Sequence, residues 1–200
     1  MAVPDILEAA HLFVSHAVQP GDTVVDATVG NGHDTEFLAD EVGDAGRVYG
    51  FDIQAIALER TRDRLRTANN LAQVELIHAG HEKMDTHLPE EDCGRVGAAM
   101  FNLGYLPGHG AGPTTTPATT LAALPQAVEV IRPGGIITVV LYTGHAGGEE
   151  EAEAVQNWGV EQPQTALQVL SYNFINRQND PPRLLVIEKK SSGSGAAPAA

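Results

Sequence analysis

Two carboxylates and two glycines lie close together in sequence near the start of the chain, and residues of these types at this spacing could bind a nucleoside. Asp26 precedes Gly30 and Gly32 in VVDATVGNGHD, and Asp52 ends the next apolar run, RVYGFD. Glycine can adopt a positive φ and lets the backbone pass close to a ligand, because it has no Cβ. A carboxylate at Asp52 can accept hydrogen bonds from both hydroxyls of a ribose. The alternative role for Asp52 is an N-cap of the helix expected after it.

The glycine spacing favours S-adenosylmethionine over NAD. The dinucleotide fingerprint G-x-G-x-x-G requires a third glycine where this chain has Thr35. S-adenosylmethionine has no pyrophosphate, and it brings a sulfonium and an amino acid tail instead. We expect Asp26 to meet the ammonium of that tail, directly or through water. Thr28, Asn31 and His33 supply further polar groups, although His33 could equally cap its own helix.

A second group of residues could hold a methyl acceptor. The segment MFNLGYLPGHG places Asn102, Leu103 and Tyr105 at the end of a predicted strand, in partial resemblance to methyltransferases that act on nitrogen. An attacking amine must be held by acceptors, such as the Asn102 side-chain oxygen and the Leu103 carbonyl. Tyr105 could stack on a base or a sugar. The alternative is a strand-to-loop turn rich in Asn, Gly and Pro.

Three histidines are candidates for further roles near this site. An aliphatic amine is mostly protonated near neutral pH and must lose a proton before it attacks, so an imidazole base would help. His145 in LYTGHAGGEE is the first candidate and His109 the second, with a surface position as the alternative for either. His81, in HAGHEKMD, is expected to border an adenine. Its HxxH spacing gathers no further ligands, so we expect no metal.

Alternating strand and helix patterns position these residues. Apolar β-rich runs separated by helical stretches are typical of a parallel sheet with crossover helices. The last two strands are joined by INRQNDPP, too short for a crossover helix, so they should pair as an antiparallel hairpin. The prediction is therefore an α/β, Rossmann-like fold with a seven-stranded, mostly parallel sheet and an antiparallel last strand. Predicted strands are 22–27, 47–52, 73–79, 96–102, 135–142, 167–174 and 183–189; predicted helices are about 5–18, 33–42, 54–68, 82–88, 115–131 and 149–159.

The charge of the chain limits how it could contact nucleic acid. A formal net charge of -14 argues against non-specific affinity for RNA or DNA, because phosphate contacts need Lys or Arg. The segment ERTRDRLR gathers four arginines, with Arg60 and Arg64 on one helical face. Either this face contacts RNA, or it is a solvated helix surface balanced by neighbouring acids.

Length and composition indicate one domain. Residues 1–190 suit a single domain, and the tail 191–200, SSGSGAAPAA, is expected to be disordered. The lone Cys93 allows neither an intramolecular disulfide nor a zinc framework, and we expect it to be partly buried. Because no apolar run reaches the roughly 20 residues that span a bilayer, we expect a cytoplasmic protein without a membrane partner.

Taken together, the motifs resemble a bacterial family formerly called "putative rRNA methylases" and now associated with methylating the wobble uridine of tRNA. The shared motifs are DAT-GNGHDT-FLA, GFDIQ, FNLGYLPG, GH-GG--E and Y-FIN--N-PP-L-IEK, at 26–39, 50–54, 101–108, 144–149 and 172–189. Their common order over most of the chain makes the resemblance far more specific than a single glycine loop.

The resemblance implies a class I methyltransferase that uses S-adenosylmethionine. It implies conversion of 5-aminomethyl-2-thiouridine at tRNA position 34, in the anticodon stem-loop, to the 5-methylaminomethyl form, by a homodimer. Tyr105 and His145 would lie nearer the amine. Positions implied for the cofactor are Asp26, Thr28, Gly30, Asn31, Gly32, His33, Asp34, Asp52, Gln54, His81 and Asn102.

Other functions fit parts of the same sequence. The acidic composition suits a methyltransferase for a small amine. A methyltransferase for another RNA site is a further alternative, and a non-catalytic nucleotide-binding domain would keep the same fold. Asn176, Arg177 and Asn179 either rim the substrate pocket or only shape their turn.

Overall fold

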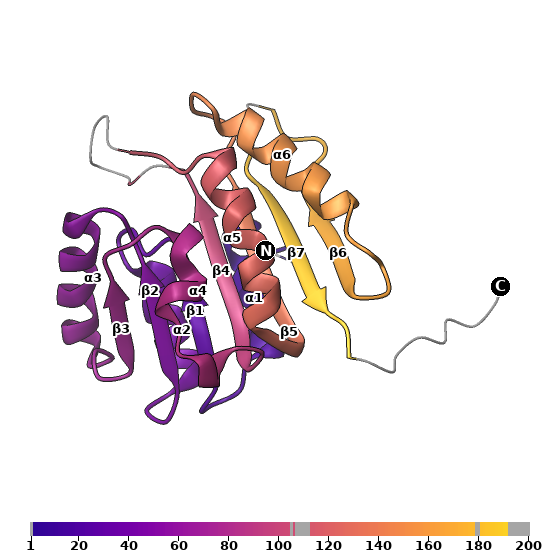
Figure 1. Cartoon of the computed structure of the whole chain (residues 1–200). Coiled ribbons are helices and arrows are strands. Elements are labelled where there is room, and N and C mark those ends of the chain that lie inside the picture. Colours follow the sequence, from indigo (N-terminus) through magenta and orange to yellow (C-terminus); the bar gives the residue numbers. More distant parts are fainter. Residues whose placement is uncertain (1, 105, 107–112, 179–180, 192–200) are drawn as a thin grey trace.

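The computed structural model describes residues 2–104, 106, 113–178 and 181–191 (Figure 1). Three residues singled out in the sequence, Tyr105, His109 and Asn179, and nearly all of the predicted tail lie outside the described residues.

The described strands form one seven-stranded sheet, in the order β3-β2-β1-β4-β5-β7-β6. Strand β7 runs antiparallel to β5 and β6, and all other neighbouring pairs are parallel. The predicted fold class and the late hairpin are confirmed. The strands are β1 (Thr23–Asp26), β2 (Arg47–Phe51), β3 (Val74–Ile77), β4 (Val96–Leu103), β5 (Ile131–Leu141), β6 (Leu167–Tyr172) and β7 (Arg183–Lys189).

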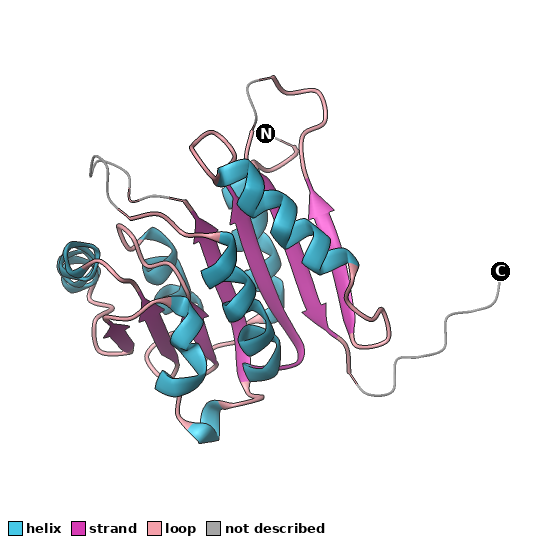
Figure 2. Cartoon of the chain, turned by 45° about the horizontal axis from the view of Figure 1, so that its top comes forward, coloured by secondary structure: helices cyan, strands magenta, loops and turns pink. Residues whose placement is uncertain are grey.

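Helices cover both faces of the sheet, and alternating strand residues supply the two cores (Figures 1 and 2). Val24 of β1 belongs to the apolar cluster of α1 and α2, whereas its neighbour Val25 belongs to the cluster of α5 and α6. Successive strand residues point to opposite faces, so a parallel strand between two helical layers must be apolar throughout. The helices are α1 (Ile6–Ala17), α2 (His33–Val42), α3 (Ala55–Ala68), α4 (Met84–His87), α5 (Pro117–Val130) and α6 (Gly148–Val160), with short 3₁₀ turns η1 (His81–Lys83) and η2 (Glu90–Asp92).

Two helices begin where the sequence predicts. Asp5 caps α1 in a reciprocal capping box with Glu8, and Thr116 caps α5 ahead of Pro117. Strand β5 differs from the prediction, because it begins at Ile131 rather than at 135. A register shift between β4 and β5 accommodates the RPGG segment as an irregularity within the strand.

The order of the strands fixes where a ligand can bind. Strand β1 pairs with β2 on one side and with β4 on the other, so the chain leaves β1 in one direction and later returns to its opposite edge. The crossover helices diverge at this switch point and leave a crevice beyond the carboxyl ends of β1 and β4. Both predicted anchors, the glycine turn and Asn102, stand at this place.

Candidate active site

A cavity of about 460 Å³ opens at the carboxyl ends of β1, β2, β3 and β4. Its volume falls in the range of small-molecule sites. The wall is completed by Pro113, Thr114 and Thr115 of the loop before α5, by Thr119 of α5 and by Tyr142, which follows β5. Of the residues singled out in the sequence, the cavity is lined by Thr28, Gly30, Asn31, His33, Asp34, Asp52, Gln54, His81, Asn102 and Leu103.

Both glycines of the turn have the positive φ that the sequence indicates, and Gly32 also lies against a neighbouring helix. Gly30 and Gly32 have φ angles of +53° and +80°. A Cβ on Gly30 would make only ordinary contacts, so the positive φ alone explains this glycine. A Cβ on Gly32 would lie 2.6 Å from the hydroxyl of Thr61 on α3. Gly32 therefore makes room for a helix, and its contact with a cofactor stays a prediction.

Asp52 joins the glycine turn to the end of β2. One of its carboxylate oxygens accepts from the Gly30 backbone N–H at 2.9 Å, and the other accepts from the Gln54 N–H at 2.8 Å. The N-cap of α3 is Gln54 and not Asp52, so the alternative role for this carboxylate is set aside. Each carboxylate oxygen has a second lone pair that can accept a hydrogen bond at the cavity wall.

Asp26 lies beneath the turn, outside the cavity lining. Its side chain is buried; the backbone N–H of Thr28 donates to one oxygen at 3.0 Å and the hydroxyl of Thr35 to the other at 2.5 Å. Burial, reinforced by the nearby Asp34, raises the pKa of Asp26 from 3.8 to about 7. In this structure Asp26 shapes the turn, and its contact with a cofactor stays a prediction.

Replacing Asp26 with Asn should make stability less dependent on pH. Because the pKa of Asp26 is raised on folding, the folded chain holds this proton more tightly, and its contribution to stability falls as pH rises from about 4 to about 7. Asp26→Asn keeps an acceptor for Thr28 and abolishes this titration. We expect the melting temperature of Asp26→Asn, taken as its difference from that of wild type, to rise from pH 5 to pH 8. Thermal unfolding at each pH measures this difference. A difference that stays constant across this range would contradict the assignment.

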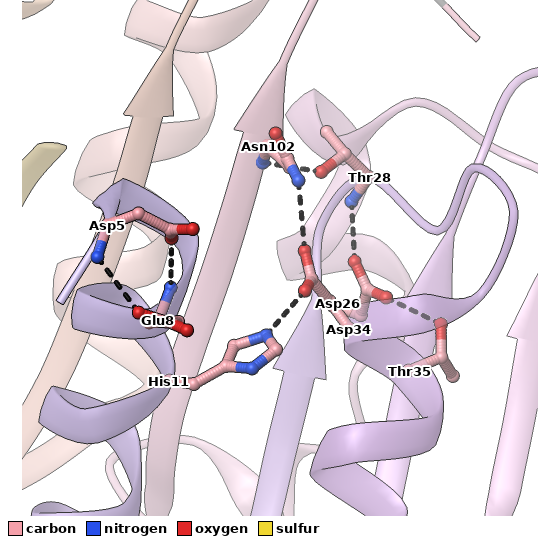
Figure 3. A network of polar contacts seen from close by, with 8 residues as sticks. All are labelled: Asp5, Glu8, His11, Asp26, Thr28, Asp34, Thr35 and Asn102. Atoms are coloured by element: carbon pink, nitrogen blue, oxygen red, sulfur yellow. Dashed lines mark hydrogen bonds and ion pairs between the residues drawn. The ribbon is translucent and has the colours of Figure 1, made fainter. Parts of the chain in front are cut away.

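A hydrogen-bonded chain connects α1 to the end of β4 (Figure 3). The Asn102 side-chain amide donates to one oxygen of Asp34 at 3.2 Å, and His11 Nε2 lies 2.7 Å from the other oxygen. The Asn102 backbone N–H donates to the Thr28 hydroxyl at 2.7 Å. With its amide nitrogen held by Asp34, the Asn102 amide has its oxygen left to accept a hydrogen bond.

His81 presents a buried acceptor at the cavity wall. Its Nδ1 lies 3.2 Å from the carbonyl oxygen of Ala27, which can only accept, so Nδ1 carries the proton. Burial lowers the pKa of His81, which keeps the ring neutral near pH 7. Nε2 is buried, with no hydrogen-bond partner among the described residues. The contact of His81 with an adenine stays a prediction.

The arginine-rich face of α3 packs against the glycine turn. Arg64 donates to the backbone carbonyl of Asn31 at 2.9 Å and forms a 2.8 Å ion pair with Glu36. Arg60 reaches the side-chain oxygen of Asn31 at 3.3 Å. His33 is the first residue of α2 and does not cap it, since the N-cap Gly32 has no side-chain bond. These arginines therefore support the cavity wall.

His145 lies near this region but does not line the cavity. An added Cβ on Gly104 would approach its Nε2 to 3.6 Å, and one on Gly148 to 2.9 Å. Its predicted role as a base stays a prediction.

Cys93, expected to be partly buried, is exposed. It follows a short 3₁₀ turn on the surface rather than an apolar segment.

Sequence reasoning missed a buried carboxylate that fixes the far wall. Glu151 of α6 is 2% exposed and accepts from the hydroxyls of Thr115 and Thr120 at 2.7 Å and 2.6 Å. Thr115 in turn accepts from the backbone N–H of Gly104, just beyond Asn102. The sequence shows only a run of glutamates, GEEE, which is typical of an exposed helix start. The sequence alone therefore does not distinguish the buried Glu151 from the exposed glutamates beside it.

Neither a membrane span nor a metal cluster is found among the residues that the structure describes. No helix in it is both long enough and apolar enough to cross a membrane. No group of three or more His, Cys, Asp or Glu side chains in it could hold a metal ion.

The lining fits S-adenosylmethionine on chemical grounds. Asp52 offers lone pairs to ribose hydroxyls at the cavity wall. Asp34 places a carboxylate in the wall, which complements a sulfonium or an ammonium.

Comparison with known proteins agrees with this chemistry. Residues 48–188 match the model of the family described as "Putative rRNA methylase". A curated Arabidopsis thaliana protein, named tRNA (mnm(5)s(2)U34)-methyltransferase, chloroplastic, is 38% identical over 192 residues, covering 92% of this chain and 69% of the relative.

Solved structures show the same similarity. A Clostridium thermocellum protein of the same description superposes with a TM-score of 0.90 at 46% identity, covering 94% of this chain and 100% of that one. A "putative methyltransferase" from Streptococcus mutans, solved in complex with SAH, gives a TM-score of 0.84 at 37% identity, covering 94% and 99% of the two chains. This chain belongs to the family described as "Putative rRNA methylase", and its fold is that of the class I methyltransferases.

Proposed function

We propose that this protein uses S-adenosylmethionine to methylate the amine of 5-aminomethyl-2-thiouridine at position 34 of tRNA. The observation that carries the proposal is the Asn102 amide at the tip of β4, whose nitrogen is held by Asp34 while its oxygen is left to accept from an amine. The 38% identical relative is named for this reaction.

The residues of this chain would act by holding the amine. The bound cofactor supplies a methyl group activated by its sulfonium. The Asn102 oxygen and the Leu103 carbonyl would accept the two N–H groups of the neutral amine and direct its lone pair along the line of attack. Tyr142 and the loop from Pro113 to Thr115 would exclude water from the cavity.

The family description and the relative's name point to different RNAs. Nucleoside mass spectrometry of tRNA and rRNA, from cells with and without the gene, separates them. We expect the unmethylated aminomethyl nucleoside to accumulate in tRNA when the gene is absent, and purified protein to convert it. An unchanged tRNA profile with a lost rRNA methylation would replace this proposal with the family's description. Methylation of free small amines alone would favour the small-amine alternative.

The loop after β6 is the proposed contact for the anticodon stem-loop. Tyr172 of β6 and Val140 of β5 both pair with Leu184, so β6 ends at the same edge of the sheet as β5. Beyond it the Arg177 guanidinium lies 3.7 Å over the Phe174 ring, and Ile175 is 93% exposed. A cation and exposed apolar atoms at the edge of the sheet where β5 also ends suit phosphate contact and base stacking.

Replacing Arg177 with Ala should weaken tRNA binding. Loss of one phosphate contact is expected to raise the Kd about 3- to 10-fold and to reduce the slope of log K against log salt by about one. Filter binding across a salt series measures both values. Arg95→Ala is the matched control, because this exposed arginine precedes β4 at the opposite edge of the sheet. Equal effects of the two variants would exclude a specific contact at the loop.

We further propose that the protein works as a homodimer in the cytoplasm, as the family resemblance implies. Light scattering during size-exclusion chromatography checks the first part, and a monomer mass at working concentrations would refute it.

A further inference from the structure

We propose that His11 of α1 is a positioning residue for methyl transfer, because through Asp34 it fixes which way the Asn102 amide faces. The inference deepens the proposed function, on whose reaction it rests. His11 stands in the first helix, 91 positions before Asn102 in the numbering, and is absent from the motifs that carry the family resemblance.

The contacts form one continuous chain. His11 Nε2 lies 2.7 Å from Asp34 Oδ1, and Asn102 Nδ2 donates to Asp34 Oδ2 at 3.2 Å (Figure 3). The Asp34 side chain is only 11% exposed, whereas that of His11 is 31% exposed. Asp34 also lines the cavity, and His11 does not. His11 therefore acts on the cavity through Asp34.

The orientation of the Asn102 amide matters because its two ends have opposite hydrogen-bonding properties. The nitrogen only donates and the oxygen only accepts. A carboxylate at Asp34 pairs with the nitrogen and turns the oxygen away from itself. A flipped amide would present N–H groups to an amine that also donates, so the amine would lose an acceptor. The carboxylate must therefore stay in place to keep the amide correctly oriented.

His11 holds that carboxylate by two features. Its Nε2 donates to Asp34, and its ring stacks on Phe37 with centroids 3.8 Å apart and an interplanar angle of 4°. Phe37 belongs to α2, the helix that carries Asp34. The stack keeps the imidazole edge directed at Asp34. Among the described residues, Asp26 beneath Asp34 and Tyr142 in the cavity wall also feel its charge.

Two substitutions separate the stack from the hydrogen bond. His11→Phe retains a ring over Phe37 and removes the donor, and His11→Gln retains a donor near the Nε2 position and removes the ring. We expect His11→Phe to lower kcat about 10- to 100-fold while KM for tRNA and cofactor affinity change little. His11→Gln should retain kcat within about threefold of wild type. His16→Ala, an exposed histidine on the same helix, is the control and should match wild type.

A readout without turnover accompanies the kinetics. In ¹⁵N-labelled protein, the Asn102 side-chain amide is assigned by its loss in Asn102→Ala, and its hydrogen exchange is measured with SAH present. Exchange should quicken in His11→Phe and stay slow in His11→Gln. Melting temperatures confirm that both variants are folded.

Two results would overturn the inference. In the first, folded His11→Phe keeps wild-type kcat and slow amide exchange. In the second, His11→Gln is as impaired as His11→Phe. If wild-type protein fails to methylate tRNA, the proposed function fails instead, and the exchange comparison still decides whether His11 orients Asn102.

Discussion

Replacing Asn102 with Ala is expected to lower kcat about 100- to 1000-fold while cofactor affinity stays within about threefold of wild type. The Asn102 side chain contributes one acceptor for the amine, and its loss leaves an N–H group of the nucleophile unpaired in a site closed to water. The backbone bond from Asn102 to Thr28 is independent of the side chain, so the end of β4 should keep its place. Single-turnover kinetics and calorimetry with SAH measure the two quantities.

Asn102→Asp tests the same mechanism from the opposite side. In the wild-type chain the Asn102 amide donates to Asp34 at 3.2 Å. The variant retains an acceptor for the amine but places a second carboxylate at this contact. Like charges at that distance repel, so we expect activity between those of wild type and Asn102→Ala, with a lower melting temperature. Wild-type kcat in Asn102→Ala would remove this residue from the mechanism. An equal loss of kcat and cofactor affinity would assign it to cofactor binding instead.

The sequence predicted the sheet because parallel strands between two helical layers leave a strong pattern. Both faces of β1 and β4 are buried, which makes each a short apolar run, and Gly, Pro or capping residues interrupt the chain between them. The doubly wound topology then brings Asn102 next to Thr28, although 74 positions separate them. Sites at strand ends are predictable for this reason.

Contacts between helices left no comparable signal. His11 meets Asp34 only because α1 and α2 pack on the same face of the sheet, and the rotation of α1 about its axis decides which side chain faces Asp34. Thr61 meets Gly32 for a similar reason. Side-chain packing fixes these contacts, and a polar residue in a helix has the same appearance in sequence whether it points to solvent or to a site.

Replacing Gly32 with Ala should damage both stability and cofactor binding, because two separate constraints meet at this residue. Gly32 adopts φ +80° and ψ 16° as the N-cap of α2, a left-handed conformation that costs alanine about 1 kcal/mol or more. The added Cβ would also lie 2.6 Å from the Thr61 hydroxyl and 2.8 Å from its methyl group, in a buried contact. Overpacking of this kind costs about 1 to 3 kcal/mol.

A matched glycine separates the two costs. Gly147 is the N-cap of α6 with φ 83° and ψ −9°, and a Cβ there would meet nothing within 4 Å. In chemical unfolding, the free energy of unfolding of Gly147→Ala should fall only by the conformational cost. That of Gly32→Ala should fall by about 1 to 3 kcal/mol more. Thr61→Ala in the Gly32→Ala background should recover part of that difference. Since Gly30 and Asp52 are bonded through the same turn, SAH affinity of Gly32→Ala should fall at least about tenfold. Equal destabilisation by the two glycine substitutions would show that α3 shifts to accommodate the new methyl group. In that case only the positive φ would require glycine at position 32.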